Sequence, residues 1–228
     1  MHHNLTAEEL AALRNISSPT IANAIETFAI RPRGEGYTNV GIHCLFPERG
    51  VMLGYACTAM ILSGQPAATN RLVSRTKYWE YTRLAPLPKI SVVQDLSEVP
   101  LGAYFGEVNC SIHLALGSAG VITNGNVRDI SEMRATGFQV FAGGVSVSHG
   151  FAHLEDFNRP VTVFGMVVHP GDLIHADQHG AVVIPQEVAR EVINATHEIE
   201  RDEKVMIGLC KSDTFSISEL DKLISPEY

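Results

Sequence analysis

Residues 106–144 read GEVNCSIHLALGSAGVITNGNVRDISEMRATGFQVFAGG, and the apolar segment KISVVQDL precedes them at residues 89–96. The β-branched and aromatic residues typical of buried strands occupy three segments, at 89–96, 119–124 and 138–144. The apolar spacing typical of helices occupies the two segments between them, at 107–116 and 128–136. Gly117 and Gly137 each follow a predicted helix, where a residue with positive φ is easily accommodated. This order predicts a central parallel β-α-β-α-β segment and hence an α/β fold.

The rest of the chain adds elements on both sides of this segment. Apolar residues recur at helical spacing near the start, and an apolar stripe alternates with acidic residues near the end. The expected elements are two short helices within about 6–28, a loop at 31–48, a strand at 51–63, a helix at 71–84, a strand meander at 160–185 and a C-terminal helix at about 186–209. Because no linker, repeat or charge run interrupts the sequence, we expect a single domain over residues 1–228.

Charge and composition exclude several classes of partner. Lys and Arg number 17 against 25 Asp and Glu, and the resulting net charge of -8 would repel a phosphate backbone, so we expect no nucleic-acid partner. The apolar stretch at 51–62 is shorter than the roughly 20 residues of a membrane span, so we expect no membrane partner. The start MHHNLTAEEL lacks a signal peptide's apolar centre, and the four cysteines form no CxxC pair. We therefore expect a cytoplasmic protein with reduced, mostly buried thiols.

Charged residues follow two neighbouring strands of the predicted sheet. In a parallel β-α-β unit, the loops that follow successive strands emerge at the same edge of the sheet, where ligands bind. The first loop leads into Gly106 and Glu107, and the second leads through NGNV into Arg128 and Asp129. We therefore expect Glu107, Arg128 and Asp129 to be neighbours in space.

These three side chains suit a metal ion and an anionic substrate. Carboxylate oxygens bind a hard cation such as Mg²⁺, and the guanidinium fork of Arg128 matches a substrate carboxylate. The helix that starts near Glu107 adds free backbone N–H groups and the positive end of a dipole. The structural alternative is that Asp129 only stabilises the first turn of a helix and pairs with Arg128. This local pattern alone leaves both interpretations open.

The segment 106–144, together with PGDLIHADQHGAVVIP at 170–185, resembles the RraA-like family. That family includes class II pyruvate aldolases acting on 4-hydroxy-4-methyl-2-oxoglutarate and 4-carboxy-4-hydroxy-2-oxoadipate. The more specific motif is G-x-VRD with an acid 21 residues before its Arg, and the likeness extends from SPTIANAIE at 18–26 to the C-terminal helix. The resemblance implies a fold of the swivelling β/β/α type, a homotrimer or a hexamer with sites between subunits, and dependence on Mg²⁺ or Mn²⁺.

The resemblance also assigns roles to residues of the motif. It implies that Asp129 is the direct metal ligand, that Glu107 lies behind a metal-bound water, and that Arg128 holds the carboxylate and keto oxygen of the substrate. It also implies that the backbone N–H groups of Val108, Asn109 and Cys110 bind the substrate carboxylate. Gly106 would allow the close approach.

The activity that the resemblance implies is that of a metal-dependent lyase. Retro-aldol cleavage of a 4-hydroxy-2-oxo diacid, or decarboxylation of oxaloacetate, passes through a pyruvate enolate whose oxygen needs a nearby positive centre. The alternative function is a non-catalytic regulatory protein, because the family also contains inhibitors of ribonuclease E. The retained Glu107, Arg128 and Asp129 favour the enzyme.

Several residues outside the motif carry weaker expectations. Some family members carry an acid where this chain has Asn124. His149 and His153, four residues apart, could share a helical face near the site. Asp172 and Asp177 belong to a predicted hairpin and are assigned to structure. Acids of the C-terminal helix, Glu200 or Glu203, could reach a neighbouring subunit, although such acids are usually a solvated face.

Overall fold

The computed structural model describes residues 5–68 and 73–224. Its centre is an eight-stranded sheet. The four strands that run parallel are β2 (Met52–Leu62), β3 (Lys89–Asp95), β5 (Ser118–Thr123) and β7 (Gln139–Ala142). The helices that cross between the last three are α4 (Glu107–Ala115) and α5 (Ile130–Thr136). The predicted central β-α-β-α-β segment is confirmed, and Gly117 and Gly137 end the two helices with φ of 88° and 89°.

Antiparallel strands complete this sheet. The hairpin of β12 (Leu173–Asp177) and β13 (Gly180–Ile184) pairs with β2 through β12, and β9 (His153–Phe157) pairs with the other end of β2. At the far edge, the short strand β1 (His43–Cys44) pairs with β7. The chain just before β1 also bonds to β13, where the Thr38 N–H donates to Ala181 O at 2.9 Å. The chain at 38–44 therefore bonds to β13 at one edge of the sheet and to β7 at the other edge, so the sheet is nearly closed.

Two small sheets lie outside the main one. The first contains the parallel strands β4 (Ala103–Phe105), β6 (Asn126–Val127) and β8 (Gly144–Val145). The second is the hairpin of β10 (Val161–Val163) and β11 (Met166–Val168). The predicted meander at 160–185 is thus two separate hairpins, of which only the second joins the main sheet. The β4–β6–β8 sheet was not predicted, and it extends the carboxyl edge of β3, β5 and β7.

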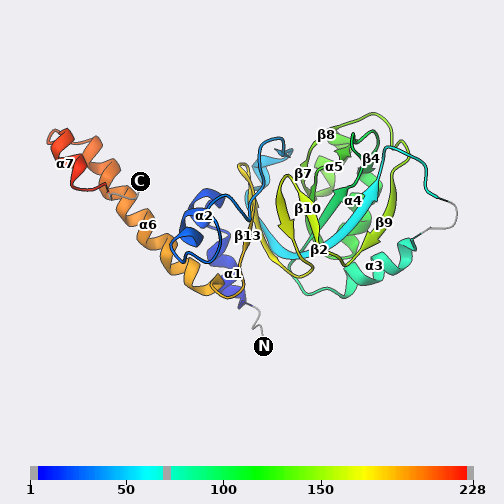
Figure 1. Ribbon diagram of the computed structural model, residues 1–228, viewed down its shortest axis with the longest axis horizontal. Helices are drawn as coiled ribbons and strands as arrows, with labels where there is room; N and C mark the ends of the chain where they lie inside the picture. The colour runs from blue at the N-terminus through cyan, green and yellow to red at the C-terminus, as the bar shows by residue number, and fades with distance from the viewer. Residues whose placement is uncertain (1–4, 69–72, 225–228) are drawn as a thin grey trace.

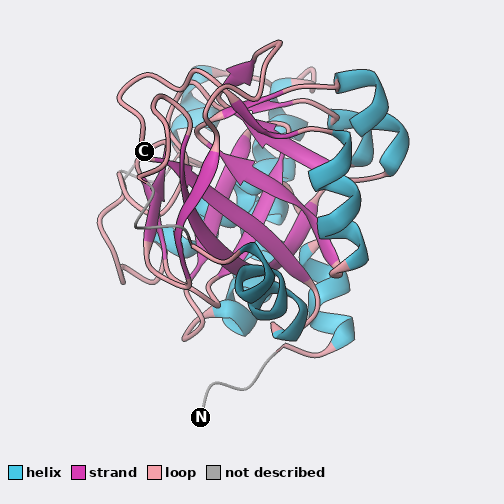
Figure 2. Cartoon of the chain, turned by 90° about the vertical axis from the view of Figure 1, so that its right-hand side faces the viewer, coloured by secondary structure: helices cyan, strands magenta, loops and turns pink. Residues whose placement is uncertain are grey.

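A helical unit packs against the other side of the β12–β13 hairpin. Its helices are α1 (Ala7–Leu13), α2 (Ser18–Glu26) and the first half of α6 (Ala189–Cys210), whose apolar side chains share one core with Leu53, Val182 and Ile184. The second half of α6 projects away from the body and carries α7 (Ile217–Asp221) at its end (Figure 1). Figure 2 shows the strands crossing the centre of the molecule with helices around them.

Polar side chains are buried inside the main core, between the sheet and α4. His113 of α4 is fully buried, and its Nδ1 lies 2.7 Å from Ser91 Oγ of β3. Burial lowers the pKa of His113 to about 4, because removing the side chain from water disfavours the charged imidazolium. The ring packs against Phe105 and Phe138. The side chain is therefore a neutral part of the core.

Some predicted boundaries and one helical interpretation were wrong. His149 lies in a turn and His153 opens strand β9, so the two histidines do not share a helical face, because the segment is extended rather than helical. The C-terminal helix begins at Ala189, three residues later than predicted. Helix α3 covers Arg75–Leu84, and residues 71 and 72 of the prediction lie outside the described residues. Within the predicted loop at 31–48, β1 and the short helix η1 (Pro47–Arg49) form.

Two predictions about environment can be compared with the structure. Among residues 5–68 and 73–224, none of the helices combines the length and the apolar character that crossing a membrane requires. All four cysteines are free thiols, as expected. Cys57 and Cys110 are buried, Cys44 is half-buried and Cys210 is exposed, so only half of them fit the expected burial.

Candidate active site

The two predicted loops meet at the carboxyl edge of the parallel strands. Asp129 Oδ2 accepts a hydrogen bond from the Glu107 N–H at 3.2 Å and lies 3.6 Å from Arg128 Nε. The backbone N–H of Arg128 donates to Phe105 O at 3.0 Å, which fixes the second loop beside the first. The structure thus brings Glu107, Arg128 and Asp129 together, as the order of strands predicts.

Asp129 has an unusual backbone conformation for a residue with a side chain. Its φ of 57° and ψ of 48° lie in the left-handed region, although it is the residue that precedes the first turn of α5. Its carboxylate does not cap α5 but turns to the start of α4. Because such a conformation costs of the order of 1–3 kcal/mol, it is typical of residues held for function.

Gly106 makes this approach possible. A Cβ at this position would collide with Asp129 Oδ2 and would lie 3.1 Å from Arg128 Cγ. Its φ of -153° is open to any residue, so glycine is required here for space and not for conformation. The predicted role of Gly106 in close approach therefore applies first to the Asp129 carboxylate.

The start of α4 offers fewer free donors than the sequence predicts. The N–H of Cys110 donates to Gly106 O at 3.0 Å and is not available to a ligand. The N–H groups of Val108 and Asn109 have no acceptor among the described residues. The Cys110 thiol is buried, and burial together with the nearby Asp129 charge raises its pKa to about 12, so it is not a nucleophile.

Asp129 and Arg128 also retain unused groups. The side chains of Arg128 and Asp129 are 38% and 35% exposed. Within the described part of the chain, Asp129 Oδ1 and the two Nη atoms of Arg128 have no hydrogen-bond or ion-pair partner. The site therefore presents one carboxylate oxygen and one guanidinium fork to solvent.

The carboxylates of the site can be compared with the ligands that a divalent cation needs. Among the described residues, no group of three or more His, Cys, Asp or Glu side chains could enclose a metal ion. A hard cation such as Mg²⁺ does not need such a cage, because it keeps several waters and binds through one or two carboxylates plus substrate oxygens. The free Asp129 Oδ1 fits a cation held in that way, with Glu107 on the adjacent helix start.

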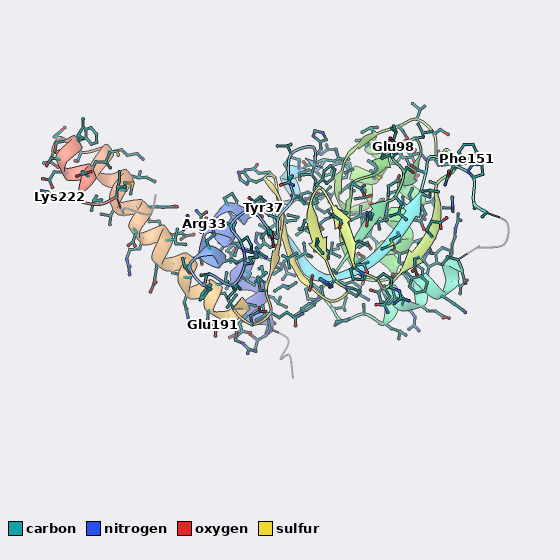
Figure 3. The ribbon with its side chains drawn as sticks, viewed as in Figure 1. Arg33, Tyr37, Glu98, Phe151, Glu191 and Lys222 are labelled. Carbon is teal, nitrogen blue, oxygen red and sulfur yellow. The ribbon has the colours of Figure 1, made fainter. Side chains whose placement is uncertain are left out.

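Exposed apolar side chains surround this edge of the sheet. They come from the loop after β3, the first turn of α4, the end of β8 and the segment after it: Leu96, Val99, Leu101, Val108, Val145, Val147 and Phe151. Hydrogen bonds join these segments, since the Ala103 N–H donates to Ser148 O and Asn126 Nδ2 donates to Pro100 O, both at 2.9 Å. Figure 3 shows Glu98 and Phe151 at the end of the molecule farthest from Lys222 of the α6–α7 arm. We call these seven side chains the apolar rim.

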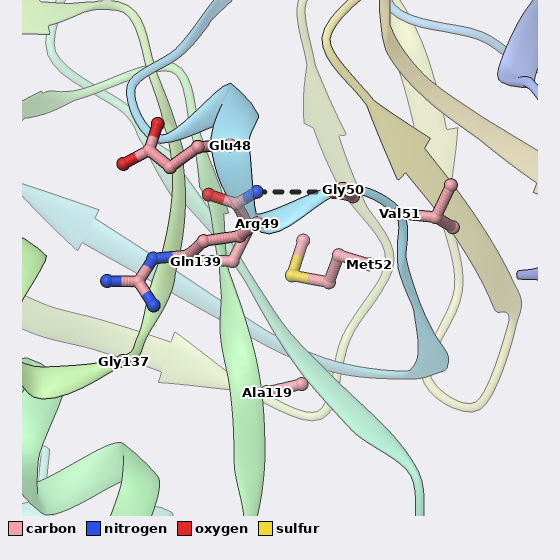
Figure 4. Close-up of a pocket in the computed structure, with 8 residues that line it drawn as sticks. All are labelled: Glu48, Arg49, Gly50, Val51, Met52, Ala119, Gly137 and Gln139. Atoms are coloured by element: carbon pink, nitrogen blue, oxygen red, sulfur yellow. Dashed lines mark hydrogen bonds between the residues drawn. The ribbon is translucent and has the colours of Figure 1, made fainter.

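A hollow of about 520 Å³ lies at the opposite edge of the sheet. It is lined by residues that begin β2, β5 and β7 and by the segment before β2, including Arg49, Met52, Ala119 and Gln139 (Figure 4). Gln139 Nε2 donates to Phe46 O at 3.0 Å and Glu48 pairs with Arg134, whereas Arg49 Nε is buried without a hydrogen-bond partner among the described residues. None of the predicted site residues lines it.

The hairpin acids have the structural role that the sequence predicts. Asp172 Oδ2 accepts from the His169 N–H at 2.7 Å. Asp177 Oδ2 accepts from the Ser18 N–H at 2.8 Å and so joins α2 to the sheet. In α6, Glu200 pairs with Lys204 on the exposed surface, and Glu203 is exposed. The reach of these two acids to another subunit stays a prediction.

Sequence reasoning missed one buried polar group at the carboxyl edge. Asp95, the last residue of β3, is 2% exposed and accepts a hydrogen bond from Ser63 Oγ. The side chain of Asn124 binds the backbone of the same residue. The only available signal was an acid at the end of an apolar strand, a pattern shared by many solvent-exposed strand ends.

The sequence pattern of the RraA-like family, described as Aldolase/RraA, matches residues 18–183. The chain belongs to this family. The match covers every residue of the site, from Gly106 to Asp129. The family description contains two names, aldolase and RraA. They correspond to the enzymatic function and the regulatory function that the sequence left open.

Individual RraA-like relatives agree with this assignment. Protein DlpA of Legionella pneumophila is 29% identical over 127 residues, which are 51% of this chain but only 21% of that protein. A protein of Halalkalibacterium halodurans named "Putative 4-hydroxy-4-methyl-2-oxoglutarate aldolase" is 27% identical over 181 residues, covering 78% of this chain and 81% of that one. The chain thus spans about a fifth of the first relative and most of the second.

Solved structures support the fold. Streptomyces coelicolor RraAS2, described as an unusual member of the RNase ES inhibitor RraA protein family, superposes with a TM-score of 0.72 and 22% identity. The superposition covers 89% of this chain and 97% of that one. The mixed α/β domain with a nearly closed sheet is therefore the RraA-like fold, as predicted.

Proposed function

We propose that the protein is a divalent-metal-dependent lyase that releases pyruvate from a 4-hydroxy-2-oxo diacid, from oxaloacetate, or from both. The observation that carries the proposal is the position of Asp129, whose carboxylate joins the loop of Glu107 to the side chain of Arg128. Family membership and the name of the Halalkalibacterium halodurans relative support the same class of reaction.

The substrate would be held by its 2-oxo acid end. The guanidinium of Arg128, whose Nη atoms have no partner among the described residues, can bind the carboxylate and the keto oxygen. The Val108 and Asn109 N–H groups at the start of α4 can bind the second carboxylate oxygen. This arrangement would place the keto group beside Asp129.

The bond that breaks in the aldol substrate joins C3 to C4. Its electron pair moves to C3 and the keto group, giving the enolate of pyruvate, while C4 becomes a carbonyl carbon as its hydroxyl proton leaves. Arg128 stabilises the negative charge on the enolate oxygen. The Glu107 carboxylate is the acid–base group of the site and takes the hydroxyl proton, directly or through a water, and protonation of C3 then completes pyruvate. With oxaloacetate, the same enolate forms as CO₂ leaves.

A metal ion would bind at Asp129 Oδ1, with Glu107 acting on its hydration shell. When bound, Mg²⁺ or Mn²⁺ supplies a Lewis acid beside the keto oxygen. Asp129 itself keeps the geometry, because its other oxygen is bound to the start of α4.

We further propose that the site is completed by other copies of the chain, as a homotrimer or a hexamer. The apolar rim supports this, because several exposed apolar side chains on the segments around a site are typical of an interaction surface. Light scattering on the purified protein tests the assembly. A monomer at micromolar concentration would contradict it.

The lyase proposal is tested by pyruvate release from oxaloacetate and 4-hydroxy-4-methyl-2-oxoglutarate, measured with and without EDTA. We expect turnover that EDTA removes and that added Mg²⁺ or Mn²⁺ restores. Asp129→Ala should reduce kcat by at least about 10³-fold while the protein stays folded. If the folded wild-type protein released no pyruvate from any such acid, the proposal would be wrong, and binding to a ribonuclease would be the function to test.

A further inference from the structure

A second carboxylate, that of Asp95, lies buried at the same edge of the sheet. Its Oδ2 accepts from Ser63 Oγ at 2.5 Å, and its Oδ1 accepts from the Ser97 N–H at 2.9 Å. None of the ion pairs among the described residues involves it. Burying a carboxylate is costly unless hydrogen bonds compensate it, so the groups that it holds are a feature to explain.

The side chain of Asp95 holds the loop that leads to Glu107. Ser63 Oγ, which donates to Asp95, accepts from the Leu101 N–H at 3.2 Å. Ser97 Oγ accepts from the N–H groups of Ser63 at 2.9 Å and Gly64 at 2.8 Å. The loop at 96–102 is thereby fixed to the end of β2, and it runs directly into β4 and the Gly106–Glu107 turn.

The backbone of Asp95 holds the other loop. Asn124 Oδ1 accepts from the Asp95 N–H at 2.7 Å, and Asn124 Nδ2 donates to Asp95 O at 2.9 Å. Two residues on, Asn126 Nδ2 donates to Pro100 O at 2.9 Å. Gly125 leaves space for this packing, because a Cβ there would lie 3.2 Å from Asp95 Oδ2. This second loop continues into β6 and then into Arg128 and Asp129.

We propose that Asp95 and Asn124 form a clamp that sets the spacing between the two loops, and that both are positioning residues for the site. The inference rests on the proposed lyase function. Glu107 comes from one loop and Arg128 with Asp129 from the other, so their separation depends on this connection. Misplacement of a reacting group by about 1 Å is enough to lower a rate by about 10²-fold.

The clamp requires an amide at position 124. Asn124 both donates to and accepts from the backbone of Asp95, whereas a carboxylate could only accept. A carboxylate there would also bring a second negative charge beside the buried Asp95. Both polar atoms of the Asn124 side chain are therefore engaged in holding the backbone of Asp95.

The test compares Asn124→Asp, Asp95→Ala and Asp95→Asn with a control, Ser18→Ala. Ser18 is also buried, at the start of α2, and its Oγ lies 2.9 Å from Nδ1 of His175 in β12. We expect kcat of the folded protein to fall about 10- to 100-fold in Asn124→Asp and Asp95→Ala, with partial rescue in Asp95→Asn. Ser18→Ala should lower Tm and leave kcat and KM unchanged. A folded Asn124→Asp variant with wild-type kcat and KM would overturn the clamp, even if Asp95→Ala fails to fold.

A second readout does not depend on activity. Hydrogen exchange measured by mass spectrometry should become faster in the segments 102–110 and 124–130 together in Asn124→Asp, and in neither in Ser18→Ala. If wild-type protein released no pyruvate, the proposed function would fail and this exchange experiment alone would decide the clamp. Faster exchange in only one of the two segments would overturn it.

Discussion

The two edges of the parallel sheet differ in what they offer a ligand. The amino edge holds the hollow of about 520 Å³, in which the side chains of Gln139 and Glu48 are bound to other protein groups. The carboxyl edge is open, and there Arg128 and Asp129 keep atoms without a partner among the described residues. In a single copy of this chain, the candidate site therefore does not lie in the hollow.

This difference shows that the size of a hollow is a poor guide to the site here. Parallel strands direct the following loops, and the starts of the following helices, to their carboxyl edge, so functional groups collect there. The exposed apolar rim around that edge is the reason for proposing that another copy of the chain completes the site. Matched substitutions test this difference between the two edges.

Among these matched substitutions, the largest effect is expected at Gly106. Gly106→Ala would place a Cβ against Asp129 Oδ2 and displace the carboxylate, so pyruvate release should fall more than about 100-fold. Gly34→Ala is the matched control, because a Cβ at Gly34 would meet nothing within 4 Å. Steady-state rates and Tm of both variants check the prediction. Equal rates in the two variants would contradict the importance of this approach.

A smaller effect is expected from exchanging the guanidinium. Arg128→Lys keeps the charge but loses the fork that binds a carboxylate at two points, so kcat/KM should fall about 10- to 100-fold. Arg49→Lys makes the same change at the amino edge and should leave kcat/KM unchanged, since Arg49 contacts Phe46 and Arg134. The comparison would be reversed if Arg49→Lys were the more damaging variant.

The layer between the two edges should respond to pH through His113. Its pKa is lowered to about 4 in the folded state, against an ordinary value of about 6.5, so the unfolded chain binds the proton more readily. The contribution of His113 to the free energy of unfolding is complete above pH 6.5. It is lost as the pH falls toward 4, and the total loss is about 3 kcal/mol. Urea unfolding between pH 4 and 7 measures the slope, and His113→Gln should reduce it.

The smallest effect is expected from the lining of the hollow. Gln139→Ala removes the bonds of Nε2 to Phe46 O and of Oε1 to the Val140 N–H, and should lower the free energy of unfolding by about 1–3 kcal/mol. The kcat of the folded protein should not change. Denaturant unfolding and the pyruvate assay on one preparation test both statements, and a large loss of kcat would assign a function to the hollow.

Sequence patterns predicted the elements whose period is local. The strands β3, β5 and β7 and helix α4 follow from apolar spacing, and their order alone made neighbours of Glu107, Arg128 and Asp129. The left-handed backbone of Asp129 could not be predicted, because it depends on the short strand β6 and on contact with α4. The clamp at Asp95 depends on groups about 30 residues away in sequence, 32 for Ser63 and 29 for Asn124, which no periodicity records.

Sequence spacing also gave two wrong predictions in extended segments. His149 and His153 are four residues apart, but the turn and strand that hold them place no helix there. The predicted meander at 160–185 divides because β10 and β11 pair only with each other. Whether a segment forms a strand, and which sheet it joins, depends on the strand that lies beside it in the fold.

The assignment of the active site to the carboxyl edge is tested most directly by a crystal structure with Mg²⁺ and oxalate, a stable mimic of the pyruvate enolate. We predict oxalate between Arg128 and the start of α4, with the metal on Asp129. Oxalate in the hollow beside Arg49 and Gln139, or a metal bound elsewhere, would contradict the assignment of the site to the carboxyl edge.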